Sequence, residues 1–335
     1  MRSSIFFAVA VLAGLVLFGA SVYAGSEYFY FAGYVVLQYV VLATAWNILG
    51  GYCGYVNFGS AAFFALGAYT SVALHKFDGS IDKWFPESIA AALHVVFPLP
   101  IPILVLFGGL VSAVVGFGMG YLTLRLRGAF FAIATLALAV VLQTLIINWD
   151  YVGGSRGAYV IRPGEISLGA FKLAYIQYLF LIMLALSVVA ICMARTIERS
   201  RLGYGFATIR DDELAAEASG VPTLRLKLIA TTLSGMLMGM AGAPFPYYIG
   251  YLQPSSAFGL EYAVNSIAMP MIGGTTSWIG PLVGAILLGT LQQIATVTIS
   301  SAVNLLLVGV LLVAFVIIAP NGIVGLYRQL RQRAK

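Results

Sequence analysis

The sequence predicts an all-α, polytopic membrane protein of about ten transmembrane helices, one of them short or re-entrant. Of its 335 residues, 61% are hydrophobic and 9% are charged, whereas soluble domains carry about 25% charged residues. So few charges cannot cover a globular surface, so most of the surface must face lipid. The 37 glycines also fit a bundle of membrane helices, in which small residues let backbones approach closely. No segment is left over for a soluble domain, so we expect residues 1–335 to form a single transmembrane domain.

Apolar runs recur along the whole chain at the length of about 20 residues that a spanning helix needs. The eighth run is short and contains Pro270, Gly273 and Gly274, which we expect to break it into a half-helix or a re-entrant element. A further stretch at 89–99 is too short to span and carries Pro98, so we expect it to be interfacial or re-entrant on the outer side. The predicted spans are about 5–24, 29–50, 52–74, 101–124, 128–149, 175–194, 228–248, 262–276, 279–299 and 302–319.

The distribution of Lys and Arg predicts the orientation of these spans. Ten crossings place both termini on the same side. If that side is the cytoplasm, 13 of the 18 basic residues lie inside and five lie outside, as the positive-inside rule requires. Residues 5–24 also resemble a signal peptide that ends at Ala24, and cleavage there would leave nine spans. The apolar run is longer than a usual signal core, which favours retention and two cytoplasmic termini.

The sequence lacks several residue patterns that particular classes of membrane protein need, and their absence restricts the functions that we expect. The predicted spans contain no Asp, Glu, Lys, Arg or His, although proton- and voltage-driven proteins usually carry such groups in the membrane. The chain has no Gly-Lys pair for a nucleotide-binding loop, no metal-ligand spacing and no catalytic set of paired acids or Ser/His/Asp. We therefore expect no enzyme activity, no cofactor and no bound metal. The net charge of +6 is spread between apolar runs, which is not typical of nucleic-acid binding.

The largest predicted cytoplasmic loop, residues 195–227, contains a run of charge in TIRDDELAAEASGVP at 208–222. Thr208 can cap a helix whose first turn holds acidic residues, where the helix dipole favours them. Gly220 and Pro222 can end it. The pattern predicts a helix of about three turns near 209–219, outside the bilayer. Spacing alone leaves open whether this helix is a solvated connector or a docking element.

Four stretches carry a resemblance to a known family. Ala215-Ala216 followed by Gly220 resembles the coupling-loop motif of ABC importer permeases, and the chain resembles the M-type subunit of the branched-chain amino acid permease family. Leu214 stands where the wider motif usually has Glu, and Tyr204 where the family usually has a basic residue. The matching stretches, in the family's order, are GGYCGYVNFGSAAFFALGAYTSVAL (50–74), RGAFFAIATLALA (127–139), LGYGFATIRDDELAAEASGV (202–221) and GGTTSWIGPLVGAILLG (273–289).

The resemblance implies an ABC importer permease fold in the bacterial inner membrane, working by alternating access. The partners would be two cytoplasmic ABC ATPase subunits, a second homologous permease and a periplasmic solute-binding protein. The resemblance implies that the ATPase contact is made by Arg210, Asp212, Glu213, Ala215, Ala216, Glu217 and Gly220. The glycine-rich elements at 50–59 and 273–284 indicate a substrate pathway with Asn57, Gly59, Ser60, Gly273 and Gly274 as its candidate residues.

Several alternatives stay open. Related permeases serve urea, short amides and other amino acids, so branched-chain amino acids are one expectation among these. An ion-coupled secondary transporter could also use broken helices. It would normally need an ion site, and the spans hold no acidic residue. A passive channel is a third alternative, which flux against a gradient would exclude.

Overall fold

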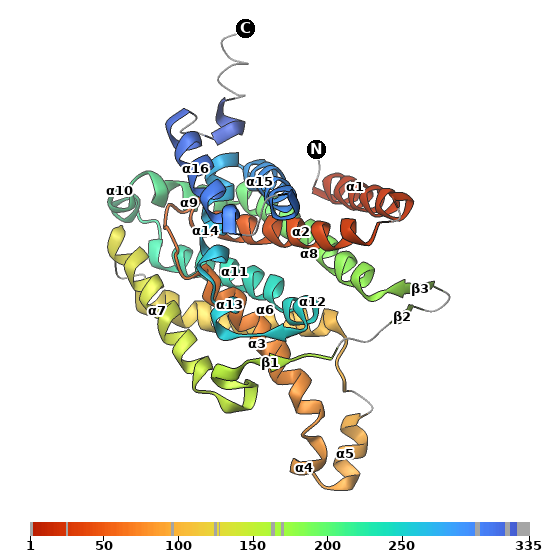
Figure 1. Cartoon of the computed structure of the whole chain (residues 1–335). Helices are drawn as coiled ribbons and strands as arrows, with labels where there is room; N and C mark the ends of the chain where they lie inside the picture. The colour runs from red at the N-terminus through yellow and green to blue at the C-terminus, as the bar shows by residue number, and fades with distance from the viewer. Residues whose placement is uncertain are drawn as a thin grey trace.

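The structure is a computed structural model that describes residues 3–24, 26–94, 97–123, 126, 128–161, 165–168, 171–298, 302–318 and 322–326. Nearly all of these residues are helical (Figure 1). The longer helices are α1 (Ser3–Ala24), α2 (Glu27–Leu49), α3 (Ser60–Asp78), α6 (Ile101–Thr123), α7 (Ala129–Ile147), α8 (Tyr175–Glu198), α9 (Arg201–Asp211), α11 (Thr223–Gly242), α14 (Leu260–Gly273), α15 (Ile279–Thr298) and α16 (Ala302–Ile318). The short helices are α4 (Ile81–Trp84), α5 (Glu87–His94), α10 (Glu213–Ala218), α12 (Phe245–Ile249) and α13 (Pro254–Ala257), with 3-10 turns η1 (Asp150–Val152) and η2 (Gly154–Arg156).

The prediction of a purely α-helical chain needs a small correction, because the described residues also form two antiparallel two-stranded sheets. β1 (Ala158–Tyr159) pairs with β4 (Tyr251–Leu252), and β2 (Glu165–Leu168) pairs with β3 (Phe171–Ala174). All four strands lie in connections between long helices. There the backbone has no helical partner of its own and finds one across the loop.

Six helices of the described chain have the length and composition to cross a membrane: α2, α6, α7, α8, α11 together with α12, and α15. The other four predicted spans also contain helices, namely α1, α3, α14 and α16. α14 has 14 residues, fewer than the roughly 20 of a full span. A short eighth element is therefore present. Its predicted break at Pro270 is wrong, because this proline lies inside the helix and the helix ends at Gly273.

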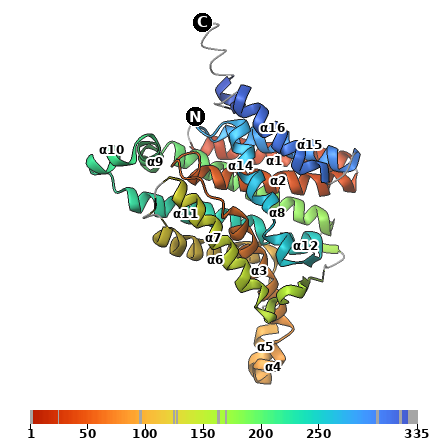
Figure 2. The same cartoon turned by 60° about the vertical axis from the view of Figure 1, so that its left-hand side comes forward.

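Both ends of the described chain lie at the end of the molecule that carries α9 and α10 (Figure 2). The Arg195 guanidinium, near the end of α8, lies 3.6 Å from the centre of the Phe6 ring. A Cβ placed on Gly322 would lie against the backbone of Gly274. The start of α1 therefore lies beside the end of α8, and Gly322 lies beside the end of α14. We refer to this end as the α9–α10 end.

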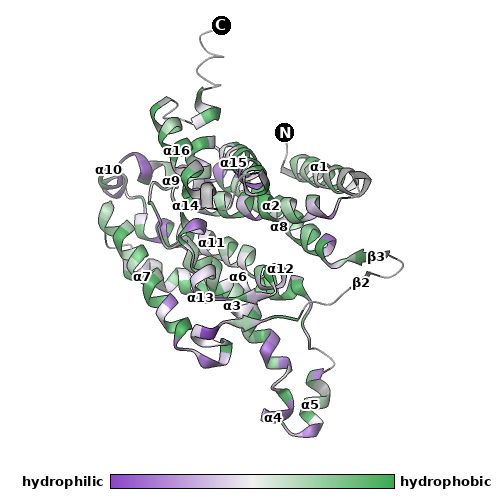
Figure 3. Cartoon of the chain, viewed as in Figure 1, coloured by the Kyte–Doolittle hydropathy of each residue, from purple (hydrophilic) through white to green (hydrophobic). Residues whose placement is uncertain are grey.

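The opposite end carries α4 and α5, which project away from the long helices in both views (Figures 1 and 2). His94 of α5 bonds Asp82 of α4 at 2.9 Å, and this hydrogen bond is the main factor that raises the pKa of His94. The stretch 89–99 begins within α5. The long helices are mainly apolar, and polar residues gather at α9, α10 and the α4–α5 projection (Figure 3).

The centre of the bundle is the contact of α11 with α3 and α6. Glycines let these helices approach to backbone contact. A Cβ on Gly67 of α3 would overlap the carbonyl of Gly239 in α11, and a Cβ on Gly108 of α6 would lie 3.2 Å from the same carbonyl oxygen. In a membrane, where lipid offers no hydrophobic drive for helix association, such close van der Waals packing is what holds helices together.

Gly67→Ala should therefore destabilise the protein by about 1–3 kcal/mol, the usual cost of overpacking. The matched control is Gly118→Ala in α6, where an added Cβ meets nothing within 4 Å. That change should stabilise the helix by about 0.5–1 kcal/mol. Thermal unfolding of the two purified variants in detergent measures the difference. Equal midpoints would show that the Gly67 contact does not hold the bundle.

Candidate functional site

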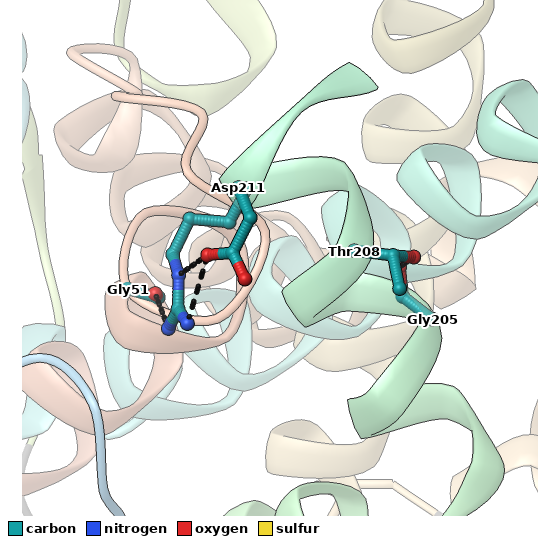
Figure 4. A network of polar contacts seen from close by, with 5 residues as sticks. Gly51, Gly205, Thr208 and Asp211 are labelled. Carbon is teal, nitrogen blue, oxygen red and sulfur yellow. Dashed lines mark hydrogen bonds and ion pairs between the residues drawn. The ribbon is translucent and has the colours of Figure 1, made fainter. Parts of the chain in front are cut away.

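The charged run at 208–222 forms two helices rather than the single predicted helix over 209–219. α9 ends at Asp211 and α10 begins at Glu213, because Asp212 is extended, with φ −161° and ψ 109°. The Asp212 carboxylate accepts a hydrogen bond from Ala215 N at 3.0 Å and caps α10. Thr208, the predicted cap, lies inside α9 and donates its hydroxyl to Gly205 O at 2.8 Å (Figure 4). An Asp side chain that can bond the backbone locally competes with the helix at this position.

The predicted end of the segment is confirmed. Gly220 has a φ of +81°, and Gly220 N donates to Glu217 O at 3.0 Å. Val221 N donates to Ala216 O at 3.0 Å. A glycine in the left-handed region just past a helix is the usual way to end it.

Residues 50–59, the first of the two glycine-rich elements, are not helical. The predicted span over 52–74 therefore becomes helical only at Ser60. We call residues 50–59 the unwound segment. Gly54 has a φ of +79°, which a residue with a side chain rarely adopts. From Gly54 to Gly59 burial alternates, so that Tyr55 and Asn57 face the interior while Val56 and Phe58 are each 40% exposed.

Neighbouring helices hold the unwound segment in place. Trp46 Nε1 donates to Asn57 O at 2.9 Å, and Phe58 N donates to Thr135 Oγ1 of α7 at 3.1 Å. The Tyr55 ring packs edge-on against Phe131 of α7 at 5.0 Å. These bonds supply the partners that the backbone loses where the helix stops, as a nonhelical segment at membrane depth requires.

α9 and α10 contact the unwound segment directly. Arg210 donates to Gly51 O at 3.4 Å and bonds Asp211 at 3.3 Å (Figure 4). A Cβ on Gly54 would lie 2.9 Å from Cγ of Arg210, so glycine at this position leaves room for the arginine. The Glu213 carboxylate bonds the Tyr55 hydroxyl. It also pairs with Lys227 of α11 at 2.6 Å.

A second break, residues 274–278 between α14 and α15, lies against the same segment. Glu198, the last residue of α8, accepts from Trp278 N at 2.7 Å and from the Tyr52 hydroxyl at 3.4 Å. A Cβ on Gly51 would lie 2.7 Å from Thr275 O. The two breaks in the helical bundle thus meet at the α9–α10 end.

The structure separates the seven predicted ATPase-contact residues into two groups. Ala216 is only 5% exposed and packs within the chain, and Glu213 is also largely enclosed, with 13% of its side chain exposed. Glu217 accepts from the Thr223 hydroxyl at 2.8 Å. The outward group is Arg210, Asp212, Ala215, Glu217 and Gly220.

The predicted pathway residues are brought to two places. Asn57 accepts from Gly59 N at 2.8 Å, and its amide nitrogen is buried with no hydrogen-bond partner in the structure. The Ser60 hydroxyl bonds that of Ser266 in α14 at 2.8 Å. Asn57 and Gly59 belong to the unwound segment, and Ser60 is the first residue of the helix that follows it.

Gly273 and Gly274 lie at the end of α14. A Cβ on Gly273 would overlap Gly280 O, so close packing of α14 on α15 accounts for this glycine. Gly274 has a φ of +115°, which a residue with a side chain rarely adopts.

Sequence reasoning missed Tyr55, Glu198 and Lys227. Lys227 was assigned to the exposed loop by its charge, yet 3% of its side chain is exposed. Its partners lie 14 and 172 residues away in the chain, and no local pattern reports a contact across such distances. The one available signal was a lysine at the start of an apolar helix. Within the described residues, no group of three or more His, Cys, Asp or Glu could hold a metal ion.

The cap of α10 gives a test of this geometry. Asp212→Ala should destabilise α10 by about 1 kcal/mol, because the cap bond to Ala215 N is lost. Asp212→Asn keeps an acceptor oxygen and should behave almost as the wild type. Hydrogen exchange of the amides over 213–218, in detergent, measures the effect. Equal exchange in the two variants would mean that the carboxylate does not cap the helix.

Comparison with known proteins bears on what this end of the molecule does. A family model described as "Branched-chain amino acid transport system / permease component" matches residues 28–316. The high-affinity branched-chain amino acid transport system permease proteins LivM of Salmonella typhimurium and Escherichia coli are each 27% identical over 316 residues, which is 88% of this chain and 69% of theirs. The autoinducer 2 import system permease protein LsrC of an Enterobacter species is 26% identical over 245 residues, 70% of this chain and 67% of its own.

No solved structure matches the chain. The family match, by contrast, extends from the second residue of α2 almost to the end of α16 and includes both breaks and the whole α9–α10 segment. The chain therefore belongs to the permease-component family of the branched-chain amino acid transport system.

Proposed function

We propose that this chain is the transmembrane permease subunit of an ATP-driven importer that carries branched-chain or related small amino acids by alternating access. One observation carries the proposal. The helices outside the bundle, α9 and α10, bond directly to a segment where the bundle is unwound. A permease without its own ATP site has to receive work through such a rigid contact.

The proposed topology has ten crossings with both termini in the cytoplasm. Its support is the alternating direction of the ten long elements: α1, α3, α7, α11 and α15 run away from the α9–α10 end, and α2, α6, α8, α14 and α16 run toward it. The position of Phe6 and Gly322 beside α8 and Gly274 supports two termini at one end. The excess of basic residues in loops at that end supports the cytoplasmic side.

The outward face of α9 and α10 is the proposed contact for one of two cytoplasmic ATPase subunits. Leu214, directly after Glu213, is 63% exposed, and Tyr204 of α9 is 71% exposed. Exposed large apolar side chains within a polar segment are typical of a protein contact. Ala215, which is exposed, takes the docking role that the motif gives to the alanine pair, and Ala216 fixes α10 to the chain. A second homologous permease completes the pathway, and the α4–α5 end is the proposed side for the solute-binding protein.

The proposed solute route passes the unwound segment. Its candidate residues remain Asn57, Gly59, Ser60, Gly273 and Gly274. Val56 and Phe58 join them, because their side chains are exposed beside buried Asn57. Apolar side chains of this kind suit an aliphatic solute. The name of LsrC shows that a related permease imports autoinducer 2, so other small polar solutes, including urea, short amides and other amino acids, are the alternative.

Uptake by the reconstituted complex tests the proposal. Proteoliposomes would hold this chain with its second permease and ATPases, and labelled leucine would be supplied with the binding protein. We expect uptake only when ATP is present on the side of the membrane where the ATPases are bound. Leucine uptake by this chain without ATPases, driven by a sodium or proton gradient, would establish a secondary transporter instead. ATP-driven uptake of a different solute would keep the permease and change its cargo.

Ala215→Trp tests the docking face. The indole should block the ATPase contact and abolish copurification of the ATPases while leaving the thermal stability of the chain unchanged, because Ala215 is exposed. The matched control is Ala137→Trp on the exposed face of α7, within the membrane. That variant should retain its ATPases. Copurification from membranes in mild detergent is the measurement, and full recovery with Ala215→Trp would place the contact elsewhere.

A further inference from the structure

A buried charged cluster joins α10, α11 and the unwound segment. It consists of Tyr55, Glu213 and Lys227. Only 3% of the Lys227 side chain and 13% of the Glu213 side chain are exposed, and Tyr55 is buried as well. Charges are rarely kept in a protein interior unless they are paired and hydrogen-bonded, because their dehydration is costly. A cluster retained here calls for a reason beyond stability.

Each of the three side chains contacts the other two. Lys227 Nζ bonds Oε1 of Glu213 at 2.6 Å, and the other carboxylate oxygen, Oε2, accepts from the Tyr55 hydroxyl. Lys227 Nζ also lies 3.3 Å from the Tyr55 hydroxyl and 4.8 Å from the centre of its ring. If α10 moved alone, it would leave a buried ammonium and a buried hydroxyl without this carboxylate. Motion of α10 together with Tyr55 avoids that cost.

Each end of the cluster is attached to a firm element. Glu213 is the first residue of α10, and the Asp212 cap fixes its place. Tyr55 packs against Phe131, and the chain beyond it is held by the bonds of Asn57 O and Phe58 N. A displacement of Tyr55 would therefore act on residues 54–58, whose burial alternates. Val56 and Phe58, which are exposed beside buried Asn57, would move with it.

The Arg210 contact is a weaker link between the same elements. Its bond to Gly51 O is 3.4 Å long, and a third of its side chain is exposed. Water can replace a bond of this kind at little cost, whereas it reaches the buried Glu213–Lys227 pair far less easily. The buried cluster is thus the stronger connection.

We propose that Tyr55, Glu213 and Lys227 transmit the movement of α10 to the unwound segment, and so set how many ATP molecules are spent for each solute carried. They are positioning residues, which touch neither nucleotide nor solute. This inference rests on the proposed ATP-driven import, and it assigns the internal step between ATPase docking and the opening of the route.

Tyr55→Phe is the sharpest variant. It keeps the ring that packs on Phe131 and Lys227 but removes the hydroxyl that bonds Glu213. In the reconstituted complex we expect the ratio of ATP hydrolysed to leucine imported to rise about tenfold, as loss of one hydrogen bond to a charged group implies. ATPase copurification and the leucine concentration for half-maximal uptake should stay as in the wild type. The matched control is Tyr159→Phe, an exposed tyrosine of β1 at the other end.

The ion pair is tested by exchange of its charges. Glu213→Gln and Lys227→Met should each raise the same ratio. The double variant Glu213→Lys with Lys227→Glu should bring it back toward the wild-type value, because the pair is restored in reverse. The control Arg225→Met removes an exposed charge two residues before Lys227 and should leave the ratio unchanged.

A thiol probe distinguishes transmission from folding support. In a Cys53→Ala, Cys192→Ser background, Val56→Cys introduces a cysteine on the exposed face of the unwound segment. Its rate of modification should change when ATP and vanadate trap the ATPases, and this change should vanish when Tyr55→Phe is added. A merely structural role would alter thermal stability and leave the nucleotide-dependent change in place.

The outcomes separate the two proposals. If the wild-type complex imports leucine with ATP, and Tyr55→Phe keeps both the wild-type ratio and the nucleotide-dependent labelling of position 56, transmission through the cluster is wrong and the import function stands. If the wild-type complex shows no ATP-dependent uptake of any tested solute, the proposed function itself fails.

Discussion

In a lipid environment, every backbone N–H and C=O has to find its hydrogen-bond partner within the protein, because the hydrocarbon supplies none. This requirement governs the whole architecture. Where the chain stays helical, it satisfies itself. Where it unwinds, at residues 50–59 and 274–278, it needs help from side chains such as Trp46, Thr135 and Glu198. The two breaks lie against each other, so a single region of the bundle carries the cost of both.

The helices α9 and α10, which lie outside the bundle, contact this unwound region. α9 and α10 could have stood apart from the bundle as a hydrated connector. Instead, Arg210 and Glu213 bond the unwound segment, and the ion pair to Lys227 carries the connection into α11. The family match supplies the context of transport, and these contacts join the helices outside the bundle to the segment where the bundle is unwound.

Much of this arrangement could be predicted from the sequence, for definable reasons. Long apolar runs are typical of membrane helices, and the structure has a helix in each of the ten expected runs. Gly220 was a reliable stop because its left-handed conformation suits few other residues. Two failures have different causes. Pro270 stays in α14, which packs closely on α15, and a local pattern does not contain such a tertiary contact. Asp212 rather than Thr208 caps α10, because an aspartate that bonds a nearby backbone N–H competes with the helix.

The pairing of β1 with β4 bears on how the protein is made. Ala158 and Leu252 are partners across the two-stranded sheet, yet α8, α9, α10, α11 and α12 are synthesised between them. The strand after α7 therefore has no partner in this sheet until five further helices have been synthesised. The small sheet can form only after α12 has been made, so it joins the two boundaries of the whole middle section of the chain.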